Sequence, residues 1–430
     1  MAATPPSFSF RVNTMNDRPQ PSRLSIGVAA IVILLLGMRI ELFAQVTVGM
    51  ILAIMLIPCW FPALRKYRGA HGIMLLGVAA LGSGVLLYAA SSSDHVTNVT
   101  LLVSQTSVMV ELLVGAGVLI WARELMSDGW VAGLFGVGLL IGLSPDSSLF
   151  SSNPWKFGFS TGVTVIALAL AHHTRKRWLE LVVIASLVFV SARTDSRSSF
   201  AILALTFILV AWQLRTTRSI RGGTGLRFVF GLAAIGIVVY GVGQSLILNG
   251  YLGDSAQQRS ISQIDASGSL IVGGRPELAA TAALMAERPF GFGTGVVPSF
   301  ADVTVAKHGM QGIGYQPDNN YVESYMFGDR FELHSVVGDL WAEFGLAGIV
   351  FTLALVGYSI RGLSYGIAHR TMSSVMIYFV IRGFWNMLFG PVYGSAILLL
   401  PLVGLVLIRQ AEHHQTQSPR NSLARARRMS

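Results

Sequence analysis

Residues 71–90 read HGIMLLGVAALGSGVLLYAA and contain no Asp, Glu, Lys or Arg. A helix needs about 20 apolar residues to cross the hydrocarbon core of a bilayer, and this stretch supplies them. Similar runs recur along the chain with short polar breaks, near 25–40, 44–64, 71–90, 100–121, 129–144, 157–172, 179–192, 199–214, 228–248, 335–360, 371–389 and 392–408. We therefore predict an all-α fold, a polytopic membrane helical bundle of about twelve transmembrane helices. The run near 179–192 is short, which leaves eleven spans as the alternative.

The composition supports this class of protein. The 430 residues are 53% hydrophobic and 12% charged, with a mean hydropathy of +0.61, whereas soluble domains carry roughly 25% charged residues. The net charge of +10 does not indicate a nucleic-acid partner, because the basic residues are spread over short loops between apolar runs. The single cysteine, Cys59, excludes an intramolecular disulfide.

The distribution of basic residues predicts the topology. Loops on the cytoplasmic side of a membrane carry an excess of Lys and Arg, and most of the 31 Lys and Arg residues fall there if the N-terminus is cytoplasmic. We therefore expect a multi-pass protein of the cytoplasmic (inner) membrane with both termini in the cytoplasm. The predicted segments are a cytoplasmic tail (1–24), spans one to nine (25–248), a large periplasmic or extracellular loop (249–333), spans ten to twelve (334–409) and a basic cytoplasmic tail (410–430).

The large outer loop is expected to contain short helices. Its stretch 274–289, GRPELAATAALMAERP, has Pro276 and Glu277 where a helix would begin and Pro289 where it would end. Such a helix would hold Arg275 at its start.

Arginines near the outer ends of the predicted spans are candidates for binding phosphate, because arginine is costly beside hydrocarbon and its planar fork suits phosphate oxygens. Arg193 and Arg197 flank Asp195, Arg275 opens the loop helix, and Arg382 lies in IRGFWNMLFG. The alternative is that Arg193 or Arg197 pairs with Asp195 and extends to the membrane interface.

His334 is the leading candidate for proton transfer, since it precedes an apolar span at the expected membrane boundary. The alternative for a single histidine is a helix-capping or interfacial role. Its context is HSVVGDLWAEFGLAG, in which Ser335 follows His334, and Gly345 and Gly348 follow after nine and two further residues.

Three motifs together resemble the O-antigen ligase and Wzy polymerase superfamily. They are the histidine motif, SRSSF from Ser196, and Gly274-Arg275 followed by ERPFGFG from Glu287. The resemblance covers about 191–409, and the first half matches only as a series of apolar spans. It implies a metal-independent glycosyltransferase without a cofactor, which uses an undecaprenyl-diphosphate-linked oligosaccharide as donor and a growing glycan or lipid as acceptor.

By this resemblance the catalytic residues are His334, Arg275 and Arg197. Arg193 and Arg288, where only the neighbourhood matches the family, are candidates for contact with the diphosphate or glycan, as is Arg382 from its position near the outer end of a span. Membrane lipids, a chain-length regulator and a flippase of the same pathway are the expected partners, without nucleic acid. No metal site is expected, because no His, Cys and carboxylate set has ligand spacing.

The expected activity is polymerisation of repeat units into surface polysaccharide or exopolysaccharide, with O-antigen ligase as the alternative. A second class of function is a transporter or flippase that binds an anionic substrate through its outer arginines. A third is a lipid-phosphate sugar transferase that uses Glu41, although we expect the neighbouring Arg39 to pair with that carboxylate.

Overall fold

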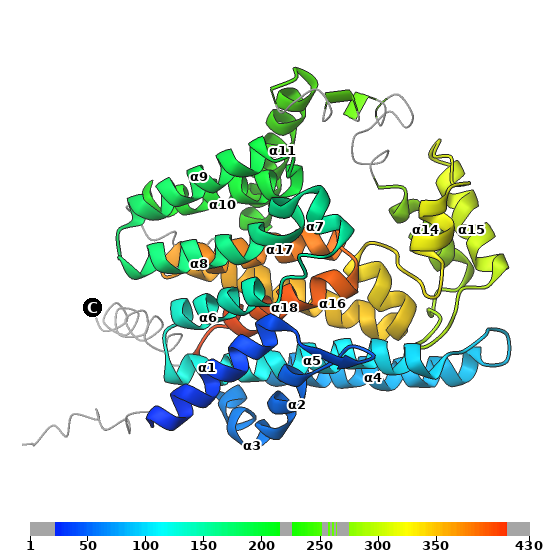
Figure 1. The fold of residues 1–430 in the computed structure, drawn as a ribbon, viewed down its shortest axis with the longest axis horizontal. Helices are drawn as coiled ribbons and strands as arrows, with labels where there is room; N and C mark the ends of the chain where they lie inside the picture. The colour runs from blue at the N-terminus through cyan, green and yellow to red at the C-terminus, as the bar shows by residue number, and fades with distance from the viewer. Residues whose placement is uncertain are drawn as a thin grey trace, which may run out of the picture.

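The computed structural model describes residues 22–215, 226–251, 257–258, 260–261, 264 and 275–410. Within these residues the secondary-structure elements are helices apart from one hairpin, β1 (Glu41–Phe43) and β2 (Val46–Thr47) (Figure 1). The helices are α1 (Arg23–Met38), α2 (Val48–Met55), α3 (Ile57–Trp60), η1 (Pro62–Lys66), α4 (Ala70–Ser91), α5 (Val99–Leu125), α6 (Asp128–Ile141), α7 (Ser148–Ser152), η2 (Trp155–Phe159), α8 (Ser160–His173), α9 (Arg177–Arg193), α10 (Arg197–Arg215), α11 (Leu226–Leu248), α14 (Glu277–Glu287), α15 (Phe300–Gln311), η3 (Tyr321–Met326), α16 (Val336–His369), α17 (Ser374–Phe389) and α18 (Val392–Val406).

Each predicted apolar run coincides with one or more of these helices, as a multi-pass membrane protein requires. Among the described residues, five helices are long and apolar enough to cross a bilayer, namely α4, α5, α10, α11 and α16. The run near 44–64, predicted as one span, is instead bent by 58° between α2 and the segment formed by α3 and η1, and it would be a sixth crossing if the pair is counted as one. The helices α1, α6, α17 and α18 are apolar but shorter.

One end of the bundle gathers basic residues from loops that are far apart in the sequence. Tyr67, after η1, forms a β-bridge with Arg409, beyond α18. Arg123, near the end of α5, donates a hydrogen bond to the carbonyl of Leu407 at 3.0 Å. The loop between η1 and α4, the loop between α5 and α6, and the segment after α18 therefore meet at this end.

The described part of the predicted outer loop packs at the opposite end, beside the turn between α4 and α5 (Figure 1). The loop helix predicted at 274–289 is confirmed as α14, with Pro276 preceding it and Glu277 in its first turn. α14, α15 and η3 share a hydrophobic core that reaches the start of α16, made by Ala280, Leu284, Phe292, Val296, Ala306, Met310, Val322, Met326, Phe327, Phe331, Leu333, Trp341 and Ala342. Most of 1–24, all of 411–430 and the loop residues 252–256, 259, 262–263 and 265–274 lie outside the described residues.

The long helix α16, predicted as an uninterrupted span, is broken at Gly345. This residue has φ 63° and ψ −149°, outside the helical region. The break frees the carbonyl of Ala342, which accepts hydrogen bonds of 2.9 Å from the backbone N–H groups of both Phe292 and Gly293. The Pro-Phe-Gly turn after α14 thus docks onto α16 at Gly345, the first glycine of the histidine motif.

Candidate functional site

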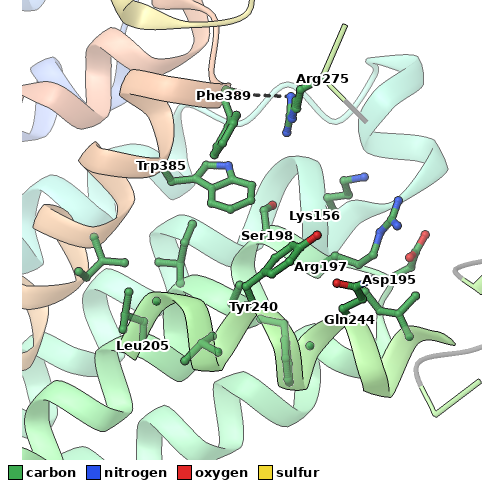
Figure 2. A pocket seen from close by; sticks show the side chains of 18 residues that line it. Lys156, Asp195, Arg197, Ser198, Leu205, Tyr240, Gln244, Arg275, Trp385 and Phe389 are labelled. Carbon is green, nitrogen blue, oxygen red and sulfur yellow. Dashed lines mark hydrogen bonds between the residues drawn. The ribbon is translucent and has the colours of Figure 1, made fainter. Parts of the chain in front are cut away.

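A cavity of about 470 Å³ lies between α10, α11 and α17. Figure 2 shows Lys156, Arg197 and Arg275 on one side of it, and Leu205 on the opposite side. The remaining lining is largely apolar or aromatic and includes Phe200, Ile202, Val239, Tyr240, Ile381, Trp385 and Phe389. The cavity therefore combines a cationic rim with apolar walls, an arrangement suited to an amphipathic anion.

Arg275 is held at this rim by the C-terminal end of α17. Its Nη1 donates a hydrogen bond to the carbonyl of Phe389 at 3.2 Å, and its guanidinium carbon lies 5.2 Å from the centre of the Phe389 ring. The last carbonyls of a helix lack partners within the helix and carry partial negative charge, so they favour a cation there. No carboxylate of the described residues lies within 4 Å of Arg275 to neutralise it.

Arg197 reaches the same rim from the first residue of α10. Its Nη1 donates a hydrogen bond of 2.9 Å to the hydroxyl of Ser260, and Asp195 lines the cavity beside it. Arg193, the last residue of α9, has an exposed side chain and is not among the lining residues. The structure therefore brings Arg197 and Arg275 to one cavity and leaves Arg193 outside it.

His334 precedes α16 with a left-handed backbone, φ +51°. The N-cap of α16 is Ser335, whose hydroxyl accepts a hydrogen bond from the N–H of Gly338 at 3.2 Å. The helix-capping alternative for His334 is therefore wrong, because its neighbour performs that role. The His334 ring is half-buried, and its Nδ1 lies 3.2 Å from the carbonyl oxygen of Glu332.

The end of α17 brings His334 and Arg275 to the same region. Ser335 donates a hydrogen bond to the carbonyl of Met387 at 2.9 Å, and Arg275 binds the carbonyl of Phe389 two residues later. His334 itself does not line the cavity, and its link to the cationic rim runs through the end of α17.

The buried carboxylate of Asp339 fixes the backbone next to His334. One carboxylate oxygen accepts a hydrogen bond from the N–H of Leu333 at 2.6 Å, and the other accepts from the N–H of Val392 at 2.7 Å. Val392 is the first residue of α18, where the backbone N–H groups have no partner within the helix. Asp339 therefore couples the histidine segment to a second helix.

Two tyrosines that sequence reasoning missed lie beside His334, and a glutamate that it also missed holds one of them. The Tyr321 hydroxyl donates a hydrogen bond to Glu277, and the rings of Tyr321 and Tyr325 lie 5.7 Å and 5.0 Å from the His334 ring. Burial, followed by the Glu277 carboxylate, raises the pKa of Tyr321 above its ordinary value. The four-residue spacing of the tyrosines was visible in NYVESYM, but nothing in that pattern specified the π-helical turn η3 that carries them.

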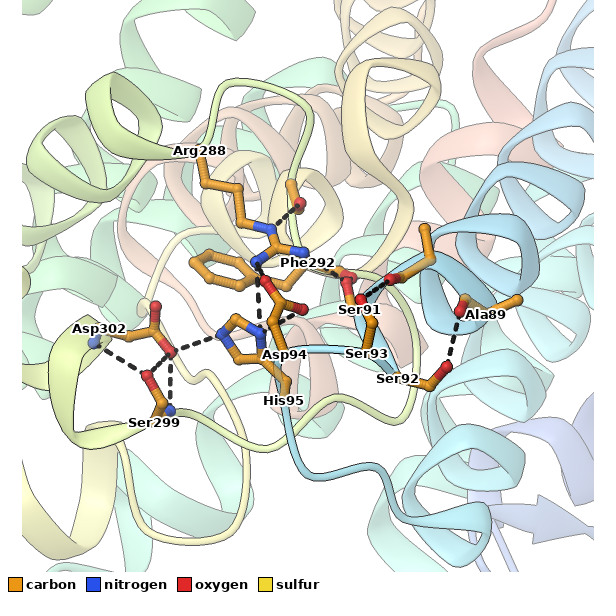
Figure 3. A network of polar contacts seen from close by, with 12 residues as sticks. Ala89, Ser91, Ser92, Ser93, Asp94, His95, Arg288, Phe292, Ser299 and Asp302 are labelled. Carbon is orange, nitrogen blue, oxygen red and sulfur yellow. Dashed lines mark hydrogen bonds and ion pairs between the residues drawn. The ribbon is translucent and has the colours of Figure 1, made fainter.

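Arg288 lies in a separate polar network that joins the outer loop to the end of α4 (Figure 3). Its Nη1 donates to Asp94 at 2.8 Å and its Nη2 donates to the hydroxyl of Ser91 at 2.7 Å. The ring nitrogens of His95 lie 3.0 Å from Asp94 and 3.0 Å from Asp302. Hydrogen bonds from Arg288 and then His95 lower the pKa of Asp94 to about 2. Arg288 is not a lining residue of the cavity, and its visible contacts hold the loop in place.

Two other arginines differ from expectation. Arg382, expected near the outer end of its span, lies midway along α17; its Nε is buried and has no hydrogen-bond partner among the described residues. Arg39 does not pair with Glu41: its Nε lies 3.8 Å from Glu111, while Glu41 accepts a hydrogen bond from the N–H of Gln45 at 2.9 Å.

The described residues contain no group of three or more His, Cys, Asp or Glu side chains that could hold a metal ion. No protein-family model matches the chain, and no curated protein or solved structure matches it significantly. Function is therefore inferred from the sequence motifs and from the geometry of this site.

Proposed function

We propose that the protein is a membrane glycosyltransferase that polymerises undecaprenyl-diphosphate-linked repeat units into surface polysaccharide or exopolysaccharide. The observation that carries this proposal is the cavity that joins a rim of Lys156, Arg197 and Arg275 to apolar walls. The end of α17 that holds Arg275 also binds Ser335, the residue after His334. A lipid-linked diphosphate has the same two parts, because a compact polyanion is joined to a long hydrocarbon chain. Arginine forks pair with its phosphate oxygens, and the apolar walls fit the first isoprene units.

In the proposed reaction the oxygen of an acceptor hydroxyl attacks the anomeric carbon of the donor sugar. The bond between that carbon and the diphosphate oxygen breaks, and undecaprenyl diphosphate leaves. Arg275 and Arg197 stabilise the charge that develops on the leaving diphosphate. His334 accepts the proton of the attacking hydroxyl, which requires the neutral imidazole.

The proposal includes a topology of about twelve crossings with both termini in the cytoplasm and 249–333 outside. It is supported by the meeting of the basic loops at one end of the bundle and of α14, α15 and η3 at the other. On this topology the cationic rim lies near the outer surface, where a translocated lipid-linked sugar would present its diphosphate.

The deciding experiment is deletion of the gene followed by gel analysis of surface glycan and of lipid-linked intermediates. A polymerase predicts loss of long chains with retention of single-repeat material. Finished polymer that accumulates on the lipid carrier would instead indicate a ligase. Repeat units trapped on the cytoplasmic face would indicate a flippase and overturn the proposal.

A further inference from the structure

The π-helical turn η3 places the rings of two tyrosines close to the ring of His334. The Tyr321 and Tyr325 rings are stacked, with centres 5.7 Å apart and an interplanar angle of 23°. The His334 ring lies 5.0 Å from Tyr325 at 43°. We call Tyr321, Tyr325 and His334 together the aromatic face. Short π-helical segments occur frequently at functional sites, which makes this turn a candidate for more than a connection.

The two tyrosines differ in how they are held. Tyr321 is half-buried, and its hydroxyl is bound to Glu277, a carboxylate that is only 5% exposed in the first turn of α14. Tyr325 is 51% exposed, and the described residues offer its hydroxyl no hydrogen-bond partner. The position of the Tyr321 ring is thus fixed through its hydroxyl. The Tyr325 ring is exposed, and its hydroxyl can still donate and accept a hydrogen bond.

This arrangement matches the chemistry of a sugar. A pyranose has a face of C–H groups that packs against aromatic rings, and hydroxyls around its edge that need hydrogen-bond partners. Tyrosine supplies both an apolar ring and a polar tip at a low cost in conformational entropy. A sugar stacked on Tyr325 would hold its edge hydroxyls against the His334 ring, which is the approach that proton transfer requires.

We infer that the aromatic face is the subsite that binds the accepting sugar ring and orients its hydroxyl toward His334. Tyr325 is the stacking residue, and Glu277 is a positioning residue that acts through Tyr321. This inference rests on the proposed function and extends it, because the cavity accounts for the donor and leaves the acceptor without a binding surface. The rival explanation for an exposed tyrosine in this protein is an anchor at the membrane interface. An anchor does not require a second tyrosine locked by a buried carboxylate.

The test uses the purified full-length protein with the lipid-linked repeat unit at a fixed saturating concentration. The varied acceptor is the repeat-unit oligosaccharide released from its lipid by mild acid. Tyr325→Ala should raise the KM for this acceptor about tenfold, corresponding to about 1.4 kcal/mol of lost binding free energy, with kcat changed less than about twofold. Tyr325→Trp should remain close to wild type because it keeps a ring and a polar N–H. Tyr325→Phe keeps the ring but loses the hydroxyl, so it should raise the acceptor KM only about twofold to threefold. The matched control is Phe300→Ala, which removes an 88% exposed aromatic side chain at the start of α15.

The outcomes separate the inference from the function on which it rests. If the wild-type protein transfers no sugar from the lipid-linked donor, the proposed function fails. If it transfers sugar and Tyr325→Ala leaves the acceptor KM unchanged, the acceptor subsite is overturned while the function stands. If Tyr325→Ala lowers the melting temperature and Tyr325→Leu restores both stability and acceptor KM, the residue is an anchor, and the subsite is again overturned.

Discussion

Arg275 is joined to Phe389 twice, through a hydrogen bond of 3.2 Å to its carbonyl and through a guanidinium that lies 5.2 Å from the centre of its ring. The carbonyl and the ring belong to one residue at the end of α17, so together they fix both the position and the tilt of the guanidinium. A planar cation held in this way keeps its remaining N–H groups available at the rim of the cavity.

Replacement of Arg275 by Lys tests whether this orientation matters. Lys keeps the charge, but a single ammonium cannot donate two parallel hydrogen bonds to a diphosphate or stack as a plane on Phe389. We expect kcat/KM for the lipid-linked donor to fall about tenfold or more in a protein that folds normally. Arg361→Lys, the same change at an exposed position on α16, is the control and should keep wild-type activity. If Arg275→Lys makes polysaccharide of wild-type length, Arg275 has no substrate role and serves only at the start of α14.

The break in α16 gives a prediction about stability. A Cβ on Gly345 would lie 2.4 Å from the carbonyl oxygen of Phe290, at a φ of +63° that L-residues rarely adopt. Gly345→Ala should therefore lower the free energy of unfolding by at least about 2 kcal/mol. Gly357→Ala in the same helix meets no atom within 4 Å and should stabilise by about 1 kcal/mol. Thermal unfolding in detergent compares the two, and equal melting temperatures would contradict the tight packing of the Pro-Phe-Gly turn.

The network around Asp94 predicts a weak sensitivity to acid. The folded pKa of Asp94 is about 2, below the ordinary 3.8, so its stabilising effect is complete above about pH 4 and is lost as the pH falls through about 2. Asp94→Asn should remove this dependence. We expect the melting temperature of the wild type to fall by roughly one to two degrees more than that of the variant between pH 5 and pH 2. Parallel curves for the two proteins would show that the contact between Arg288 and Asp94 contributes nothing in solution.

Topology can be tested with single cysteines in a Cys59→Ala background. Phe300 is 88% exposed on the loop expected to face outward, and Thr371 is exposed between α16 and α17 at the basic end. With an impermeant maleimide applied to cells whose outer envelope is permeabilised, Phe300→Cys should be labelled and Thr371→Cys should not. The reverse pattern would invert the proposed topology and place the cationic rim in the cytoplasm.

The helices could be predicted from the sequence because apolar runs and proline positions act locally. α14 was expected from Pro276 and Glu277, and it forms there. The break at Gly345 could not be predicted, since a Gly-x2-Gly pair also occurs in straight helices. The break leaves the Ala342 carbonyl to bind the N–H groups of Phe292 and Gly293, which are far away in the sequence.

The site was partly predictable for the same reason. Arg197 and Arg275 stand out as cations beside apolar runs, and both line the cavity. Nothing in the sequence singles out Tyr325 or Lys156 as a site residue, because tyrosine and lysine are common at membrane boundaries. Their positions depend on the turn η3, which places the Tyr325 ring against His334, and on the packing that brings Lys156 of η2 to the same cavity as α10.

The backbone of His334 makes this residue the sharpest test of the proposed mechanism. Its φ of +51° is poorly tolerated by most side chains, and asparagine is among the few that adopt it readily. Because Ser335 caps α16, His334→Asn should keep the helix start, the hydrogen bond to Met387 and the melting temperature. It should nevertheless lose activity, since an amide cannot accept a proton near neutral pH.

If His334 is the general base, His334→Asn and His334→Gln should both lower kcat by a factor of roughly 10²–10⁴ while the KM for the lipid-linked donor changes little. The two amides separate proton transfer from positioning, because each can still donate or accept a hydrogen bond. Partial recovery in His334→Gln, measured with the purified protein, would indicate that the ring mainly positions the acceptor. Normal polymerisation by a stably folded His334→Asn would remove the residue from the mechanism altogether, and the aromatic face would then have to orient the sugar without a base.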